Sequence, residues 1–246
     1  LFYIFYYPEK QLLSYGIIFA YCTGFIFFMM NGMRQAIAVM IFSLSIKYIR
    51  NKNPVKYCLV IFLAFLFHYS AILLLPLYFI IQKLVNINYK TWAIIIIISI
   101  FINPSSFIYS FANRLTFLPK DYSHYINILG LQQSKFGLGF IFHIFTSIFS
   151  LYYASRIPND KYYKTIYTLY FIGIALMNMT YQSQIFQRFN VYFMFFQIPS
   201  LSYICYYLRK HNFLIQYYFI IILFLFDFIY RIIVGDSGCS PYQFGI

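Results

Sequence analysis

Acidic residues are almost missing from this sequence. Only five Asp and Glu occur among 246 residues, and charged residues of both signs make up 9%. Hydrophobic residues account for 62% and aromatic residues for 25%, and the mean hydropathy is +0.71. A water-soluble domain of this length needs far more polar surface than that. The shortage of charge therefore excludes a soluble globular protein and predicts a chain embedded in a membrane.

The alternation of polar and apolar residues that marks membrane β-strands is also absent. The apolar runs are solid stretches of Ile, Phe and Leu, several of them about 18 residues or longer, which is enough for a helix to cross a hydrocarbon core of about 30 Å. The sequence therefore predicts an all-α, polytopic integral membrane helical bundle. We expect about eight hydrophobic spans, near 13–30, 33–49, 57–82, 91–103, 136–155, 163–180, 186–208 and 213–234.

One polar-tolerant stretch and the start of the chain complete this organisation. Residues 104–135 carry Pro, Asn, Ser and charges of both signs, so we expect a loop outside the membrane. The chain opens without Met on "LFYIFYYPEK", which is typical of the end of a preceding hydrophobic segment. We therefore interpret residues 1–246 as a single transmembrane domain that is an N-terminally truncated fragment of a longer chain.

Several common chemical motifs are missing. The four cysteines show no metal-ligand spacing, the four histidines are far apart, and no acidic cluster joins them. No Gly-rich phosphate loop, serine elbow or pair of carboxylates occurs either. We therefore predict neither a metal site nor a bound cofactor.

The net charge of +13 comes from basic residues that stand between the apolar runs. There is no long basic run interleaved with aromatic residues, so nucleic-acid binding is not expected. Lys and Arg in short connections mark the cytoplasmic side of a membrane protein and contact anionic lipid head groups. Eleven residues are of this kind and should face the cytoplasm: Lys47, Arg50, Lys52, Lys56, Lys83, Lys90, Arg156, Lys161, Lys164, Arg209 and Lys210.

All these clusters lie on one side only if the run 57–82 leaves that side and returns to it. The run has about 26 residues, which is long for one helix and short for two full spans. A helix break or re-entrant hairpin that turns at "FHYS", residues 67–70, satisfies the count. The alternative is one tilted helix that obeys the charge rule poorly. On the hairpin reading, the 104–135 loop is extracytoplasmic.

Isolated arginines at the ends of spans are the next informative feature. Arg34 stands where a new helix begins in "NGMRQAIA", and Arg188 lies in the apolar and aromatic "FQRFNVYF". Desolvating a guanidinium is costly, so such residues normally face a polar cavity or a partner. Asp227 is the sole acid inside a span, which leaves an anionic ligand such as a phosphate as the natural complement. The alternative is that these arginines snorkel to the interface and set topology.

Two further titratable groups lie within spans. His68 stands in the middle of "FLAFLFHYSAILLLP", where a neutral imidazole can act as a general base. The alternative for His68 is a hydrogen-bonded core histidine. Asp227 and Arg231 have the i,i+4 spacing of a helical ion pair, which we interpret as structural.

The stretch from residue 31 to residue 80 resembles the EpsG family of Wzy-like polysaccharide polymerases. That family shows N-x-x-R-Q-x-[IL]-A at a helix start, a basic turn, an apolar helix with F-H-x-S-A, and a following L-P-x-Y. "QRFNVYF" at 187–193 and "SPYQF" at 240–244 are similar to later family elements, in the expected order. The matching residues in the first stretch are Asn31, Arg34, Gln35, Ala38, Phe67, His68, Ser70, Ala71, Pro76 and Tyr78.

The resemblance implies an enzyme of exopolysaccharide, capsule or O-antigen synthesis. Such a glycosyltransferase-type polymerase joins undecaprenyl-diphosphate-linked oligosaccharides without metal ions, at the extracytoplasmic face of the bacterial cytoplasmic membrane. Membrane lipids and other polysaccharide assembly proteins are the further partners that it implies. Arg34 and Arg188 would hold the diphosphate, and His68 would deprotonate or orient the acceptor hydroxyl. Substrate-binding roles are expected for Asn31, Gln35, Ser70, Arg114 and Tyr192, with Tyr122 and Tyr125 as further residues that could stack on sugars.

Other functions remain open at this stage. A flippase or transporter for the same lipid-linked glycan also needs cationic residues in a bundle, but they should line a path across the whole membrane. An O-antigen ligase or an acyltransferase would also combine arginines with a histidine, so these residues separate such enzymes poorly from a polymerase. A purely structural membrane subunit leaves the isolated arginines without a purpose.

Overall fold

The computed structural model describes residues 11–102, 137–157, 161–180 and 184–234. Every regular element in these ranges is helical, which confirms the all-α prediction. The expected loop at 104–135, including Arg114, lies outside the described residues. The helices are α2 (Gln11–Cys22), α3 (Phe25–Asn31), α4 (Met33–Leu44), α5 (Ile46–Arg50), α6 (Pro54–Phe67), the 3-10 helix η1 (Tyr69–Leu74), α7 (Leu77–Leu84), α8 (Tyr89–Phe101), α11 (Leu138–Ala154), α12 (Lys161–Thr180), α13 (Gln184–Met194), α14 (Gln197–Lys210) and α15 (Leu214–Val234).

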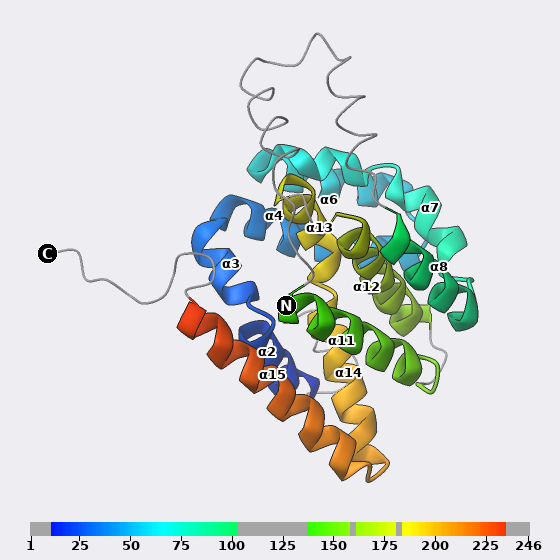
Figure 1. Cartoon of the computed structure of the whole chain (residues 1–246). Coiled ribbons are helices and arrows are strands. Elements are labelled where there is room, and N and C mark those ends of the chain that lie inside the picture. Colours follow the sequence, from blue (N-terminus) through cyan, green and yellow to red (C-terminus); the bar gives the residue numbers. More distant parts are fainter. Residues whose placement is uncertain (1–10, 103–136, 158–160, 181–183, 235–246) are drawn as a thin grey trace, which may run out of the picture.

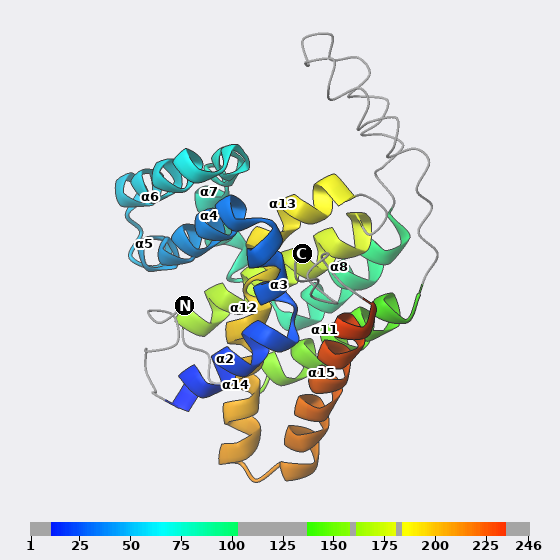
Figure 2. The ribbon, with the colours of Figure 1, turned by 90° about the vertical axis from the view of Figure 1, so that its left-hand side faces the viewer.

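The bundle is built around α12, which packs against α8, α13 and α14 (Figure 1). Its aromatic side chains Tyr167, Tyr170 and Phe171 are almost fully buried. Helix α15 lies at the edge of the bundle, where it forms an antiparallel hairpin with α14 (Figure 2). Of the apolar window in 214–233 only 11% is buried, against 78% in 187–210. An apolar helix with so little protein contact suits a lipid environment, so the fold agrees with a membrane protein.

Among the described residues, two helical stretches are long and apolar enough to cross a membrane. They are Gln187–Lys210, which continues from α13 into α14, and Leu214–Ile233. A bent pair, α2 with α3, would make a third span, and three further apolar helices have only 10–17 residues. The expected count of about eight spans is therefore not confirmed. Hydropathy reports how apolar a run of residues is, but it does not report where a helix within that run ends. Several apolar runs are therefore divided into shorter helices.

A glycine divides the first apolar run. Gly24 has φ of 74°, a left-handed conformation that ends α2, and α3 then continues at an angle of 60°. Residues with a Cβ rarely adopt this conformation. A Cβ at Gly24 would also lie 3.2 Å from Nη1 of Arg231. The run 13–30 is therefore two short helices with a break inside the bundle.

The run 57–82 is broken at His68. Helix α6 ends at Phe67, His68 is extended with φ −150° and ψ 120°, and η1 follows. The Tyr57 hydroxyl donates to the Leu74 carbonyl at 2.6 Å, and the Tyr57 and Tyr78 rings lie 5.2 Å apart. Helix α7 also packs against α5, beside the start of α6. The chain thus doubles back at the expected turn, and the alternative of one continuous tilted helix is wrong.

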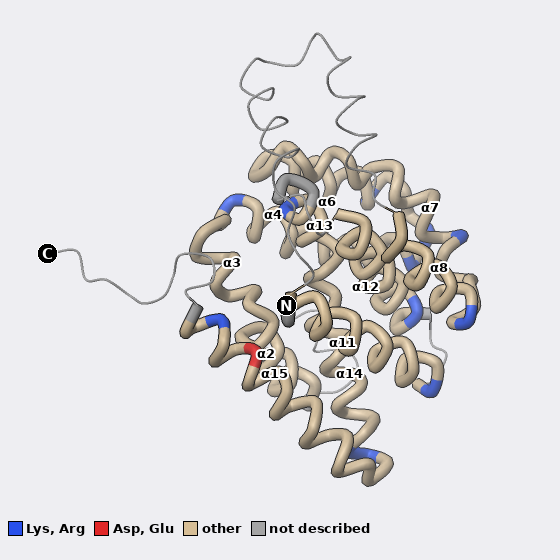
Figure 3. The backbone as a smooth tube through the Cα atoms, in the orientation of Figure 1, with Lys and Arg blue, Asp and Glu red and all other residues tan. Residues whose placement is uncertain are grey.

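The described basic residues gather at two separate places on the bundle. Figure 3 shows Lys and Arg at the ends of α7, α11 and α14 and at the start of α8 on one side, and at the starts of α4 and α13 on the other. Arg209 and Lys210 are in the last turn of α14, whereas Arg231 is in the last turn of α15. Because α15 has 21 residues, these two charged ends are about 30 Å apart. Arg209 and Lys210 therefore lie at the opposite end of the α14–α15 hairpin from Arg231.

Candidate active site

A cavity of about 920 Å³ lies where the α3–α4 junction, the end of α6 and the start of α13 meet. These three segments are far apart in the sequence and are brought together by the packing of α4 against α6 and α13. The polar lining comes from Asn31, Arg34, Gln35, His68, Gln187 and Arg188, and the remaining lining from Phe28, Gly32, Met33, Phe67, Tyr69 and Val191.

The break before α4 places Arg34 at the cavity. Gly32 separates α3 from α4, and a Cβ at this position would lie 3.1 Å from the ring of Phe28. A larger residue would push that ring, so glycine allows the tight turn. Arg34 is in the first turn of α4 and is exposed to the cavity, whereas the next residue, Gln35, is 5% exposed.

Gln35 connects the two arginine-bearing segments. Its side-chain Nε2 donates to the backbone carbonyl of Arg188 at 2.5 Å. The buried carboxamide thus satisfies a carbonyl near the start of α13 and holds α13 against α4. Arg34 and Arg188, which are separated by more than 150 residues, thereby line the same cavity.

Among the described residues, the two guanidinium groups have no counter-charge. In the described part of the chain, neither Arg34 nor Arg188 forms a side-chain hydrogen bond or ion pair, and the cavity has no carboxylate in its lining. The only acid among the described residues is Asp227, whose Oδ2 is 2.8 Å from Nε of Arg231. Two guanidinium groups in the lining of one cavity are complementary to an anion, and their planar donor sets match phosphate oxygens.

His68 is held by a chain of hydrogen bonds behind the cavity wall. Its Nδ1 lies 2.7 Å from Oγ of Ser70, and this hydroxyl donates to the Tyr192 hydroxyl at 3.2 Å. A serine hydroxyl has one proton, so Ser70 accepts from Nδ1–H when it donates to Tyr192. The Nε2 atom of His68 then carries the lone pair that a general base needs.

The surroundings of His68 also favour its neutral form. His68 lies at the break after α6, outside the candidate spanning helices. Partial burial, and then the positive charge of Arg188, lower the pKa of its imidazole below the usual 6.5. A neutral imidazole beside two fixed cations can accept a proton while the arginines bind an anion.

The residues expected from the sequence divide into three groups. Asn31, Arg34, Gln35, His68 and Arg188 line one cavity. Ser70 and Tyr192 are placed behind His68 rather than on the lining, and Tyr192 is fully buried. Arg114, Tyr122 and Tyr125 lie outside the described residues. The catalytic and binding roles themselves stay predictions.

The sequence reading missed Gln187, although it directly precedes Arg188 in "QRFN" and lines the same cavity. Its position pointed to the cavity, because Gln187 is next to the isolated Arg188 just as Gln35 is next to the isolated Arg34. Among the described residues, no three His, Cys, Asp or Glu side chains gather as metal ligands.

Comparison with known proteins gives one match. The model of the family described as the EpsG family matches residues 1–244, which is nearly the whole chain. No curated protein and no solved structure matches the chain.

Proposed function

The chain belongs to the EpsG family, and from this membership we propose that it is a Wzy-like polymerase that joins undecaprenyl-diphosphate-linked glycan repeat units. The family points to a membrane protein of the glycan-polymerase type, as the resemblance in residues 31–80 indicated. The observation that supports the finer assignment is the cavity in which Arg34 and Arg188 stand unpaired beside His68.

In this proposal Arg34 and Arg188 bind the diphosphate of the donor. The acceptor hydroxyl oxygen forms a bond to the donor anomeric carbon, and the bond from that carbon to the diphosphate oxygen breaks. His68 Nε2 takes the proton of the acceptor hydroxyl, and undecaprenyl diphosphate leaves with the bonding electron pair. The guanidinium groups stabilise the negative charge that grows on this leaving group. No metal ion is part of the proposed step.

The lipid part of such a donor has a matching surface next to Arg34. A smaller hollow of about 220 Å³ adjoins this residue and is otherwise lined by Phe65, Leu66, Phe67 and Tyr69. Leu66 is 64% exposed on the outside of α6. A prenyl chain could lie against this apolar rim, between α4 and α6, while its diphosphate stays at the guanidinium groups.

The position of the cavity at the end of the bundle opposite the clustered basic residues supports extracytoplasmic chemistry. By the positive-inside rule, the ends of α7, α11 and α14 face the cytoplasm, which leaves Arg34 and Arg188 on the outer face. A flippase needs cationic groups along a full transmembrane path, whereas these two residues share one wall at one end. We propose the bacterial cytoplasmic membrane as the location and exopolysaccharide, capsule or O-antigen as the product.

The test is complementation of a strain that lacks the gene, with the surface glycan separated on a gel. Arg34→Ala and Arg188→Ala should abolish polymer and leave single lipid-linked units, with the protein still inserted. Arg156→Ala is the matched control, because Arg156 follows the C-terminal end of α11, does not line the cavity, and stacks on Tyr152, 4.2 Å from its ring centroid. It should leave polymer length unchanged.

Each alternative outcome has a definite reading. Normal polymer from either arginine variant removes the diphosphate role. Repeat units that accumulate on the inner leaflet indicate a flippase, and one-unit glycan on the surface indicates a polymerase defect. Full activity of His68→Ala would contradict the assignment of His68 as general base, but it would not contradict diphosphate binding by Arg34 and Arg188.

A further inference from the structure

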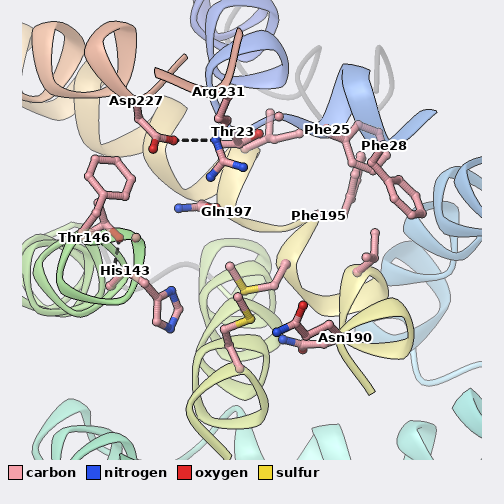
Figure 4. A pocket seen from close by; sticks show the side chains of 18 of the residues that line it. Thr23, Phe25, Phe28, His143, Thr146, Asn190, Phe195, Gln197, Asp227 and Arg231 are labelled. Atoms are coloured by element: carbon pink, nitrogen blue, oxygen red, sulfur yellow. Dashed lines mark hydrogen bonds and ion pairs between the residues drawn. The ribbon is translucent and has the colours of Figure 1, made fainter. Parts of the chain in front are cut away.

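A second cavity lies beside the first, deeper in the bundle. It has a volume of about 330 Å³ and is lined by the α2–α3 break and by α11, α12, α13, α14 and α15 (Figure 4). Phe28, Gln187 and Val191 line both cavities, so the two share a wall. Nothing in the proposed diphosphate and proton chemistry uses this inner cavity.

The inner cavity has a polar atom that the protein leaves unsatisfied. Asn190 is fully buried, and its Nδ2 donates to the carbonyl of Gly173 at 2.9 Å, but its Oδ1 has no hydrogen-bond partner among the residues that the structure describes. A buried acceptor without a partner is costly, so such an atom calls for a ligand or water. Gln197, which is 8% exposed, extends into the same space from the opposite wall (Figure 4).

The electrostatic character of the inner cavity differs from that of the outer one. Among the described residues that line the inner cavity, the only acid is Asp227, which is paired with Arg231 at 2.8 Å, so the two formal charges cancel. The described lining of the outer cavity instead has Arg34 and Arg188 without a carboxylate. A diphosphate is therefore drawn to the outer cavity, whereas the inner cavity suits a neutral ligand that both donates and accepts hydrogen bonds.

The shape and walls of the inner cavity fit a carbohydrate. Its volume lies at the lower end of the range for small-ligand pockets, enough for one or two sugar rings but not for a polymer. Phe25, Phe28, Phe142 and Phe195 provide flat apolar surface, and Figure 4 shows Thr23, Thr146, His143 and Gln197 around the same space. Apolar faces edged by carboxamide, hydroxyl and carboxylate groups match the two kinds of surface on a sugar ring.

We propose that the inner cavity is a sugar subsite, which binds a neutral sugar of the glycan while the diphosphate occupies the outer cavity. This inference rests on the proposed function, since it takes the lipid-linked glycan as the substrate. The sugar belongs either to the donor, next to its diphosphate, or to the acceptor, next to the attacking hydroxyl. Either sugar has hydroxyl groups that can form hydrogen bonds with Asn190, Gln197 and Asp227.

The test is binding to the purified full chain in nanodiscs, with three probes. They are undecaprenyl diphosphate, the lipid-linked repeat unit extracted from the strain that lacks the gene, and the repeat unit freed from its lipid diphosphate. Gln197→Met keeps the side-chain volume but removes its hydrogen bonds. This variant should bind the lipid-linked unit about fivefold to tenfold more weakly, which corresponds to the loss of one or two neutral hydrogen bonds. Its affinity for undecaprenyl diphosphate should stay within about twofold of the wild-type value.

Asp227→Asn is a second variant that keeps the side-chain shape. It should also weaken binding of the lipid-linked unit, and because it leaves Arg231 without its carboxylate, it should not weaken binding of undecaprenyl diphosphate. Gln216→Met is the matched control, because Gln216 is exposed on α15 away from both cavities, and it should change neither affinity. Weaker binding of the freed unit in Gln197→Met identifies an acceptor sugar. Loss confined to the lipid-linked form identifies a donor sugar.

The experiment distinguishes failure of the sugar subsite from failure of the proposed function. If both inner-cavity variants bind the lipid-linked unit as the wild type does, the sugar subsite is wrong, whatever the outer cavity binds. If Arg34→Ala leaves the affinity for undecaprenyl diphosphate intact, the proposed function loses its anion site, and with it the premise for a sugar beside the diphosphate.

Discussion

The carboxamide of Gln35 donates a hydrogen bond of 2.5 Å to the backbone carbonyl of Arg188, across 153 residues of sequence. This contact joins the first turn of α4 to α13 next to the wall on which both cavity arginines stand. The arrangement makes the spacing between Arg34 and Arg188 dependent on a residue that carries no charge.

Gln35→Met should therefore reduce polymer synthesis without removing either arginine. The substitution keeps the volume but leaves the Arg188 carbonyl without its donor, at a cost of about 1–3 kcal/mol to the local arrangement. We expect a drop of about fivefold or more in polymer made by membrane vesicles supplied with lipid-linked units. Gln35→Glu should be more harmful, because a carboxylate cannot donate to that carbonyl and can pair with the guanidinium groups.

The control for these two variants is Gln216→Met, a glutamine substitution on an exposed face of α15. Wild-type activity of Gln35→Met would show that the hydrogen bond is dispensable for the position of Arg188.

Ser70 should act as a positioning residue for His68. Ser70→Ala removes the hydroxyl that contacts Nδ1 and breaks the connection to Tyr192, so the imidazole loses the partner that sets its tautomer. We expect a loss of about tenfold in the polymerisation rate at saturating substrate, with little change in substrate affinity. Ser70→Thr, which retains a hydroxyl, should restore most of the rate.

Tyr192→Phe provides a graded comparison for Ser70, because it removes only the far end of the hydrogen-bond chain and keeps the ring packed against Phe42, 6.1 Å away. Its loss should be smaller than that of Ser70→Ala. A larger loss in Tyr192→Phe would contradict the order of the chain.

The acid side of the pH–activity profile should report on His68. Only the neutral imidazole accepts a proton, and burial and Arg188 lower the pKa of His68 below 6.5. Activity in vesicles should therefore persist through pH 6.5 and decline only as the pH falls through the lowered pKa. Arg188→Gln removes the positive charge, which raises the pKa of His68 and moves the decline of residual activity to higher pH.

Arg188→Lys is the matched variant in the pH experiment, since it keeps a positive charge near His68. Its rate should fall because an ammonium lacks the planar donor set, but its acid limb should stay close to that of the wild type. An acid limb above pH 6.5 in the wild type would exclude His68 as the base with a lowered pKa.

Gly173→Ala should destabilise the bundle. A Cβ at Gly173 would lie 3.0 Å from Cβ of Phe193 and 3.1 Å from the backbone nitrogen of Met194, so α12 and α13 would have to separate. Such overpacking costs about 1–3 kcal/mol. In an unpacked helix the same change stabilises by about 1 kcal/mol, so the sign of the result is decisive. The measurement is the thermal midpoint of the detergent-solubilised protein, and a raised midpoint would contradict the close approach.

The sequence by itself determined the class of protein, the family and the break at His68. The shortage of charge and the apolar runs required a helical membrane protein, because an uncovered backbone or a charged surface is costly in lipid. The motifs in residues 31–80, together with "QRFN", were enough to select Arg34, His68 and Arg188. Their isolation among apolar residues is a local property, which a sequence displays directly.

Only the tertiary structure decided the number of long helices and the contacts around the cavity. The break at Gly24 depends on backbone conformation, which hydropathy does not record. The position of Ser70 and Tyr192 behind His68 depends on how α13 packs against the hairpin. The role proposed for Asn190 depends on its contact with α12, in which Nδ2 donates to the Gly173 carbonyl and Oδ1 is left without a partner among the described residues. The contact between Ser70 and Tyr192 joins residues 122 positions apart, and no local pattern of the sequence encodes which residues meet in the fold.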